Sequence, residues 1–297
     1  MRILVTGGSG LIGRHCIEGL KKAGHDVSGT FSSGREPAME GKWVKVDLLN
    51  ADQRLKLIEA EAPEVLIHLA WNVRNWNGPE QWDWLEASKD LIRQFQKRGG
   101  QQLFTAGTSM EYAWDGQVCR ESDGRFESST EYGRAKHALW KFAETFSTDH
   151  SLTYTHGRIF FLCGPGQEET RLVPAIIHSL LKGERFGCKS GHLFRDYLDV
   201  RDVAKSINTL IELKQSGDFN IASGVPTKVA DLVNAIASEL GGLGFIDFDS
   251  APAELPCDLT VVADIEKLSQ ALGYTPVFDL KKSVLETINW IKELPRS

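Results

Sequence analysis

The chain lacks the features that usually mark a metal, membrane or nucleic-acid protein. Its five cysteines are scattered over 297 residues without paired spacing, which argues against a zinc site or disulfide framework and fits a reducing compartment. No apolar run approaches the length needed to span a bilayer, and no signal peptide precedes the first predicted strand. No basic block stands out and the net charge is −6. We therefore expect a cytoplasmic globular protein with no nucleic-acid or membrane partner.

A glycine-rich turn near the start is the most informative feature that is present. Three glycines, spaced three residues apart, follow an apolar strand at residues 2–6 and precede a helical pattern. Glycine permits a positive φ and a close approach to a pyrophosphate, and the amides that begin the helix donate to its oxygens. The turn therefore predicts a dinucleotide site. Its expected contacts are Gly7, Gly10, Leu11, Ile12 and Gly13.

Short apolar runs alternate with amphipathic stretches through the first half of the chain. This alternation predicts an α/β fold of the Rossmann type, with a doubly wound parallel sheet and helices on both faces. Further strands are expected at residues 27–31, 43–46, 65–69, 103–106 and 154–161. Helices are expected at residues 12–23, 52–62, 81–98, 131–149, 172–181 and 229–240.

The alternation weakens after residue 164, which suggests a change of domain. We predict that residues 1–164 form a dinucleotide-binding domain, to which about 196–222 return. The returning strands are expected at 197–200 and 219–222. Residues 165–195 and 223–297 are predicted to form a smaller C-terminal substrate-binding region.

Tyr132 and Lys136 are the second strong signal. Four residues apart on a predicted helix, their side chains share one face. A free tyrosine has a pKa of about 10, and a nearby ammonium favours the phenolate, which suits a general acid or base. Of the five tyrosines, only Tyr132 has a lysine four residues further on.

Together these motifs resemble the extended short-chain dehydrogenase/reductase family, and in particular its nucleotide-sugar-modifying members. The resemblance covers most of the chain. It rests on the glycine turn, Asp47-Leu48, and residues 68–70, 108–112, 132–136, 164–165 and 195–203. It implies an NAD(P)-dependent oxidoreductase or epimerase, a nucleotide-diphosphate sugar as substrate, and a homodimer.

The resemblance also implies roles for individual residues in catalysis. Tyr132 would be the general acid/base on a sugar hydroxyl or ketone. Lys136 would lower the pKa of Tyr132 and bind the nicotinamide ribose. Thr108, four residues before Tyr112, would donate a hydrogen bond to the reacting oxygen.

Further residues are implied as binding contacts. Asp47 would contact the adenine, and the other cofactor contacts expected nearby are Leu48, Leu69 and Ala70. Arg195 would meet the diphosphate, a task that suits a guanidinium, although a surface salt bridge is the alternative. Arg171 and Trp71 are expected beside the substrate. Stacking by Trp71 and the tryptophans that follow it has an alternative in helix packing or a dimer interface.

Departures from the family pattern narrow the chemistry. Ser109 and Met110 stand where 4,6-dehydratases carry Asp-Glu, and Met110 and Arg171 stand where epimerase-reductases carry Cys and His. Phe161 replaces the family's Asn three residues after Arg158, which leaves the usual substrate-loop contact in doubt. The remaining chemistry needs only Thr, Tyr, Lys and a nicotinamide.

The end of the second predicted strand bears on the choice of cofactor. NAD enzymes usually carry an acid there for the ribose 2′-hydroxyl, but none precedes Glu36. Ser32, Ser33 and Arg35 would instead suit a 2′-phosphate. NADP(H) is therefore favoured, with NAD(H) left open.

Two catalytic hypotheses and one without catalysis follow. The first is an NADP(H)-dependent reductase of a nucleotide-linked 4-keto-sugar. The second is a nucleotide-sugar 4-epimerase with tightly bound NAD. The third is a catalytically silent protein that senses the cofactor.

Overall fold

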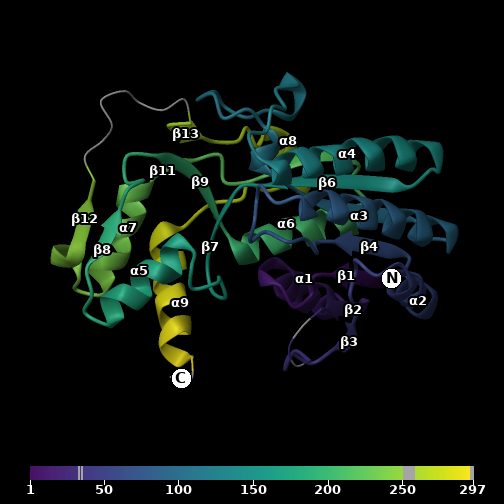
Figure 1. Ribbon diagram of the computed structural model, residues 1–297, viewed down its shortest axis with the longest axis horizontal. Helices are drawn as coiled ribbons and strands as arrows, with labels where there is room; N and C mark the ends of the chain where they lie inside the picture. The colour runs from purple at the N-terminus through teal and green to yellow at the C-terminus, as the bar shows by residue number, and fades with distance from the viewer. Residues whose placement is uncertain (33, 35, 250–257, 295–297) are drawn as a thin grey trace.

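The computed structural model describes residues 1–32, 34, 36–249 and 258–294, and a seven-stranded parallel sheet forms its centre (Figure 1). The strand order is β10-β6-β5-β4-β1-β2-β3, which confirms the predicted Rossmann-type fold. These strands are β1 (Arg2–Thr6), β2 (Asp26–Phe31), β3 (Lys42–Lys45), β4 (Val65–His68), β5 (Gln102–Thr108), β6 (Thr153–Ile159) and β10 (Gly217–Ile221).

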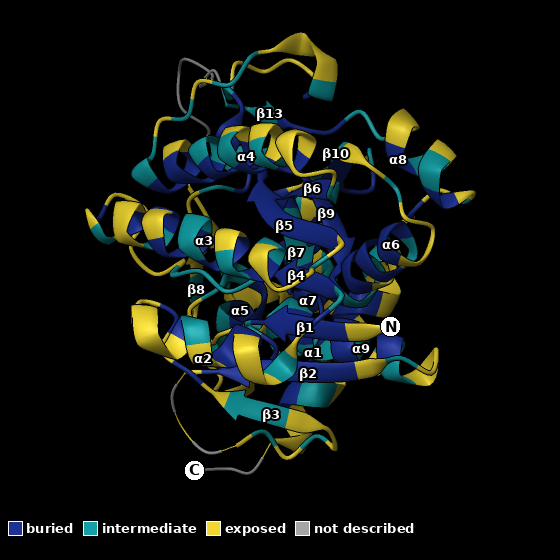
Figure 2. Cartoon of the chain, turned by 90° about the vertical axis from the view of Figure 1, so that its right-hand side faces the viewer, coloured by how far each residue is buried: buried dark blue, intermediate teal, exposed yellow. Residues whose placement is uncertain are grey.

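Helices cover both faces of the sheet, because its strands are apolar on both sides (Figure 2). One apolar core lies between the sheet and α1 (Leu11–Lys22), α6 (Val200–Glu212) and α8 (Glu266–Leu272). The other lies beneath α2 (Ala51–Glu61), α3 (Glu80–Lys97) and α4 (Glu131–Asp149). Within the described part of the chain, no helix is long and apolar enough to cross a membrane.

The C-terminal half builds a smaller body beside the carboxyl ends of the central strands (Figure 1). Its strands are β7 (Phe161–Cys163), β8 (Phe186–Cys188), β9 (Phe194–Asp199), β11 (Pro226–Lys228), β12 (Ile246–Phe248) and β13 (Thr260–Val261). Its helices are α5 (Leu172–Leu181), α7 (Val229–Glu239) and α9 (Leu280–Glu293), which pack on an apolar core of their own. Short 3-10 turns are η1 (Ser109–Glu111), η2 (Glu121–Asp123) and η3 (Leu243–Phe245).

The prediction that residues 197–200 return to the central sheet is wrong. Residues 197–199 lie in β9, which pairs with β7, β11 and β13 in the smaller sheet. The predicted strand at 154–161 also divides into β6 and β7, and β7 carries the pairing away from the centre. A short apolar run specifies a strand but not its neighbour. The other returning strand, β10, does pair with β6. The division into two domains stays a prediction.

Candidate active site

The glycine turn lies between the carboxyl ends of β2 and β4. Gly7 has φ of +67°, and a Cβ atom there would lie 2.9 Å from the backbone nitrogen of Ala70. The Gly7 amide donates to the Thr30 hydroxyl at 3.1 Å, and the Gly10 amide donates to the Gly7 carbonyl at 2.9 Å. Only glycine therefore allows this turn to pack against the backbone of the half-buried Leu69 and Ala70.

Other predicted cofactor contacts lie at the same edge, because β1 to β4 are parallel and end together. Asp47 is exposed and accepts the Leu49 amide at 2.9 Å, while Leu48 is buried. Ser32 is exposed directly after β2. Ser33 and Arg35 lie outside the described residues. The expected 2′-phosphate contact therefore stays a prediction.

Thr108, Tyr132 and Lys136 meet at the carboxyl end of β5. Thr108 ends the strand, and the Lys136 ammonium donates to the Ala106 carbonyl two residues earlier, at 2.9 Å. All three residues are buried. Tyr132 lies in the first turn of α4, where its amide donates to the Trp76 carbonyl at 2.8 Å. The fold thus brings the three predicted catalytic residues together.

Gly133 permits this approach, although the sequence interpretation assigned it no role. A Cβ atom at Gly133 would overlap the Met110 carbonyl oxygen and the Ser128 hydroxyl. The first turn of α4 therefore packs on η1 only because the residue after Tyr132 is glycine. The signal was visible in the sequence, since glycine is unfavourable inside a helix unless a close contact requires it.

Burial shifts the pKa values of both Tyr132 and Lys136. It raises the pKa of Tyr132, against the smaller opposite effects of the Thr108 side chain and the Arg171 charge. Burial lowers the pKa of Lys136 to about 7, and the Glu111 carboxylate acts in the opposite direction. In this structure the phenol is therefore protonated at neutral pH, and the amine is close to its titration midpoint.

Trp71 lies directly against Tyr132 and Lys136. The centroid of its ring is 3.9 Å from the Lys136 ammonium and 6.5 Å from the Tyr132 ring centroid. Its indole N–H donates to the buried Gln81 side chain at 2.6 Å, which holds the ring in place. Trp71 thus provides a cation–π contact to Lys136. Its expected contact with substrate stays a prediction.

The two predicted arginine contacts differ in how their guanidinium groups are engaged. Arg195 is buried and donates to the Asp258 carbonyl at 2.7 Å and to its carboxylate at 2.9 Å. A diphosphate would have to compete with these bonds. Arg171 precedes α5, with its guanidinium carbon 5.8 Å from the Trp76 ring centroid. Since the Trp76 carbonyl accepts the Tyr132 amide, Arg171 is the better placed of the two beside Tyr132.

The sequence interpretation assigned no role to Glu111, which lies in the same turn as Thr108. Its carboxylate is fully buried and accepts the Thr108 amide at 2.9 Å, while the Thr108 hydroxyl accepts the Met110 amide. This reciprocal arrangement is a capping box, and the Thr-x-x-Glu spacing that signals it was visible in the sequence. The carboxylate points into the protein and not into the site.

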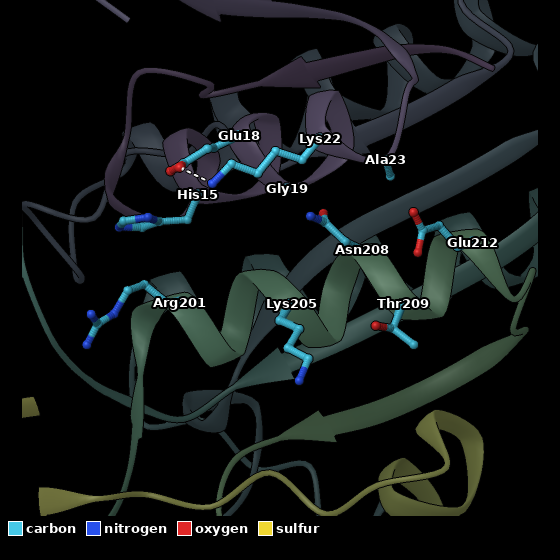
Figure 3. Close-up of a pocket in the computed structure, with 10 residues that line it drawn as sticks. All are labelled: His15, Glu18, Gly19, Lys22, Ala23, Arg201, Lys205, Asn208, Thr209 and Glu212. Atoms are coloured by element: carbon cyan, nitrogen blue, oxygen red, sulfur yellow. Dashed lines mark hydrogen bonds and ion pairs between the residues drawn. The ribbon is translucent and has the colours of Figure 1, made fainter. Parts of the chain in front are cut away.

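A pocket of about 500 Å³ lies elsewhere, between α1 and α6 (Figure 3). Its walls carry mixed charge, with Lys22 paired to Glu18 on α1 and Lys205 on α6. None of the predicted site residues is among the described residues that line it.

Comparison with known proteins identifies a family model and several similar proteins. The model of the NAD dependent epimerase/dehydratase family matches residues 3–222. The chain is 26% identical to the dTDP-6-deoxy-L-talose 4-dehydrogenase (NAD(+)) of Aggregatibacter actinomycetemcomitans, over 80% of this chain and 90% of the relative. It is 24% identical to the UDP-glucose 4-epimerase of Corynebacterium glutamicum, over 96% and 94%. The UDP-glucose 4-epimerase of Thermotoga maritima, solved with UDP-glucose, has a similar fold, with a TM-score of 0.87, 24% identity and 99% of both chains covered.

Proposed function

The chain belongs to the NAD dependent epimerase/dehydratase family of nicotinamide-dependent, extended short-chain dehydrogenase/reductase enzymes, and we propose that it reduces a nucleotide-linked 4-keto-sugar. The family uses a nicotinamide cofactor and acts on nucleotide sugars. The N-terminus of α1 fits the pyrophosphate of such a cofactor, because its N-cap is Gly10 and no side chain caps the amides that begin the helix. When bound, the cofactor supplies the hydride that reduces the ketone carbon.

The chain's own residues supply the proton and orient the reacting oxygen. Tyr132 donates its phenolic proton to that oxygen, and Thr108 orients it through its hydroxyl. Lys136 shares the face of α4 with Tyr132 and is proposed to bind the nicotinamide ribose. A phenol whose pKa is raised by burial is protonated at neutral pH, which is the state a reductase needs before turnover.

The observation that carries this proposal is the inward orientation of Glu111. It is the only acid in residues 108–112, and its carboxylate is fully buried and bonded to the Thr108 amide. Elimination of water across C5–C6 would need an acid/base group on the substrate side. Ser109 and Met110 supply none, so redox chemistry at a single carbon is favoured. The similarity to a 4-dehydrogenase supports the same carbon.

A second candidate, nucleotide-sugar 4-epimerisation, is favoured by the similarity to the Corynebacterium 4-epimerase over nearly the full chain. Epimerisation would use the same three residues in both directions and would need NAD to stay bound between the two steps. The choice of NADP(H) over NAD(H) rests on the absence of an acid at residues 30–35, while the 4-dehydrogenase relative is named for NAD(+). The homodimer also stays a proposal.

The test is to identify any nucleotide that co-purifies and then to assay NADPH and NADH oxidation with a dTDP- or CDP-linked 4-keto-6-deoxyhexose. We expect turnover that needs added NADPH, and we expect Tyr132→Phe to lower kcat by about 10³-fold or more while the cofactor still binds. Tyr112→Phe is the matched control, because this buried phenol bonds Asn220 and has no lysine partner. Interconversion of UDP-hexoses by protein that retains NAD, without added cofactor, would instead establish the epimerase.

A further inference from the structure

A cluster of buried charges lies directly behind the catalytic turn. One carboxylate oxygen of Glu111 accepts the Thr108 amide at 2.9 Å and lies 3.1 Å from His156 Nε2. The other accepts Arg158 Nε at 3.1 Å. The side chains of Glu111, His156 and Arg158 are all fully buried. An ion set of this kind, shielded from water, costs free energy unless nearly every group is paired.

Several elements hold this cluster in place. Arg158 donates through Nη1 to Asp218 on β10 at 2.6 Å, and its guanidinium carbon lies 4.4 Å and 4.3 Å from the ring centroids of Phe126 and Trp140. The charged groups paired with Glu111 are His156 and Arg158 on β6, with His137 on α4 at 3.9 Å. Tyr132 and Lys136 also lie on α4, and Lys136 donates to the Ala106 carbonyl at 2.9 Å. The next residue is Gly107, where a Cβ atom would overlap the Glu111 carboxylate. His156 and Arg158 therefore hold the Glu111 carboxylate in place while it accepts the hydrogen bond from the Thr108 amide.

We propose, on the basis of the function proposed above, that Glu111 is a positioning residue that holds Thr108 in its reactive orientation and places a buried negative charge near the Lys136 ammonium. The first effect acts through the capping box, because the hydrogen bond from the Thr108 amide to the Glu111 carboxylate fixes the backbone that carries the Thr108 hydroxyl. The second effect acts through space across a region from which water is excluded.

The two effects share one carboxylate, and two substitutions separate them. Glu111→Asp keeps the charge but shortens the side chain by one methylene, so that it loses its reach to the Thr108 amide. Glu111→Gln keeps the length and an acceptor oxygen but removes the charge. A carboxylate that only stabilises the fold would give no such division.

The positioning effect is tested by a double-mutant cycle in the intact protein. We expect Glu111→Asp to lower kcat by about 10- to 100-fold, with KM for the sugar nucleotide and the cofactor changed by less than about 3-fold. In a Thr108→Ala background the same substitution should change kcat by less than about 2-fold, because the hydroxyl that Glu111 positions is already absent. An equal loss of kcat in both backgrounds would overturn the proposal.

The charge effect is tested without substrate, by following the Lys136 side chain by NMR in lysine-labelled protein, with Lys136→Arg to assign the signal. Glu111→Gln should shift the Lys136 titration to lower pH by about half a unit or more. The matched control is Glu121→Gln, since Glu121 also accepts a backbone amide, that of Asn220 at 2.7 Å, but has no contact with Thr108. An unchanged Lys136 titration in Glu111→Gln would refute the charge effect.

The keto-sugar reductase function and the role of Glu111 can fail independently of each other. Should Glu111→Gln fail to fold, Glu111→Asp decides the positioning effect by itself, because it retains the charge that pairs with Arg158. Should no keto-sugar turn over, the proposed function fails while the Lys136 titration still tests Glu111. A Glu111→Gln protein with a lower melting temperature but wild-type kcat and an unchanged Lys136 titration would show a purely structural role.

Discussion

Two buried histidines in the central sheet make the same contact with a threonine on the neighbouring strand. His68 on β4 is the register partner of Thr6 on β1, and His156 on β6 is the register partner of Thr105 on β5. In both pairs the threonine hydroxyl donates to Nδ1, at 2.7 Å and 2.8 Å. The histidines differ in what Nε2–H meets, which is a hydroxyl for His68 and a carboxylate for His156. The second pair also has a tyrosine beside it, since the Tyr154 hydroxyl lies 2.7 Å from the Thr105 hydroxyl.

The tautomers of His68 and His156 follow from the groups that bond Nε2. Ser88 uses its own proton on the Trp84 carbonyl at 2.7 Å, so it must accept from His68 Nε2 at 2.8 Å. Glu111 can only accept, so His156 also donates from Nε2. The half of the sheet around β1 and β4 therefore holds a neutral cluster of Thr6, His68 and Ser88, whereas the half around β5, β6 and β10 holds a charged cluster of Glu111, His156, Arg158 and Asp218. The same Thr–His pair thus joins strands in both halves, and only in the second half is it connected to a charge.

The largest expected effect is on the charged cluster. Arg158→Met removes the cation shared by the buried Glu111 and the half-buried Asp218, and should lower the free energy of unfolding by about 3–5 kcal/mol, mainly through Glu111. Urea unfolding at pH 7 measures this. A loss below about 1 kcal/mol would mean that the charges of this cluster are not coupled.

Acid should affect the two clusters in different pH ranges. Burial lowers the pKa of His68 to about 3 from 6.5, so the stability from its neutral form is complete above pH 6.5 and is lost as pH falls toward 3. Burial acts to raise the pKa of Glu111, but His156 and Arg158 hold it at about 2, so its contribution is complete above pH 4.5 and is lost as pH falls toward 2.

These ranges can be separated by measuring the free energy of unfolding against pH. His68→Leu should flatten the curve between pH 6.5 and 3, and Glu111→Gln only below pH 4.5. Each should remove a slope of at most about 1.4 kcal/mol per pH unit. Identical curves for the two variants would contradict the distinction between the clusters.

A smaller effect is expected from the one bond that distinguishes His68. Ser88→Ala leaves the buried His68 Nε2–H without an acceptor and should cost about 1–2 kcal/mol in chemical denaturation. Thr209→Ala, on the surface of α6, serves as a control for the loss of a hydroxyl. If both variants unfold alike, the neutral cluster contributes nothing specific.

The smallest effect is expected at the outer end of the charged cluster. Lys267 is 45% exposed and pairs with Asp218 at 3.0 Å, while Asp218 keeps its bond to Arg158. Lys267→Met should therefore change the free energy of unfolding by less than about 1 kcal/mol, and less still at high salt. A cost near that of Arg158→Met would show that the cluster extends to the surface.

Local patterns predicted the central sheet and the shared helical face of Tyr132 and Lys136. Alternating apolar runs located its strands, and helical spacing placed Tyr132 and Lys136 on one face of α4. The same reasoning assigned residues 197–200 to the wrong sheet, because hydrophobicity does not encode which strand lies alongside. It assigned no role to Glu111, although the Thr-x-x-Glu spacing of a capping box was visible there. It also assigned no role to Gly133, although a glycine inside a helix is a visible signal.

The sequence by itself determined that a glycine turn follows the first strand and that a tyrosine and a lysine lie one helical turn apart. These are local facts, set by the conformations that glycine allows and by the period of the helix. Only the tertiary structure decided that Glu111 turns inward, that Trp71 covers Lys136, and that one histidine meets a hydroxyl and the other a carboxylate. Those outcomes depend on strand register and helix packing, which bring together residues far apart in the chain and remove the water that would otherwise screen their charges.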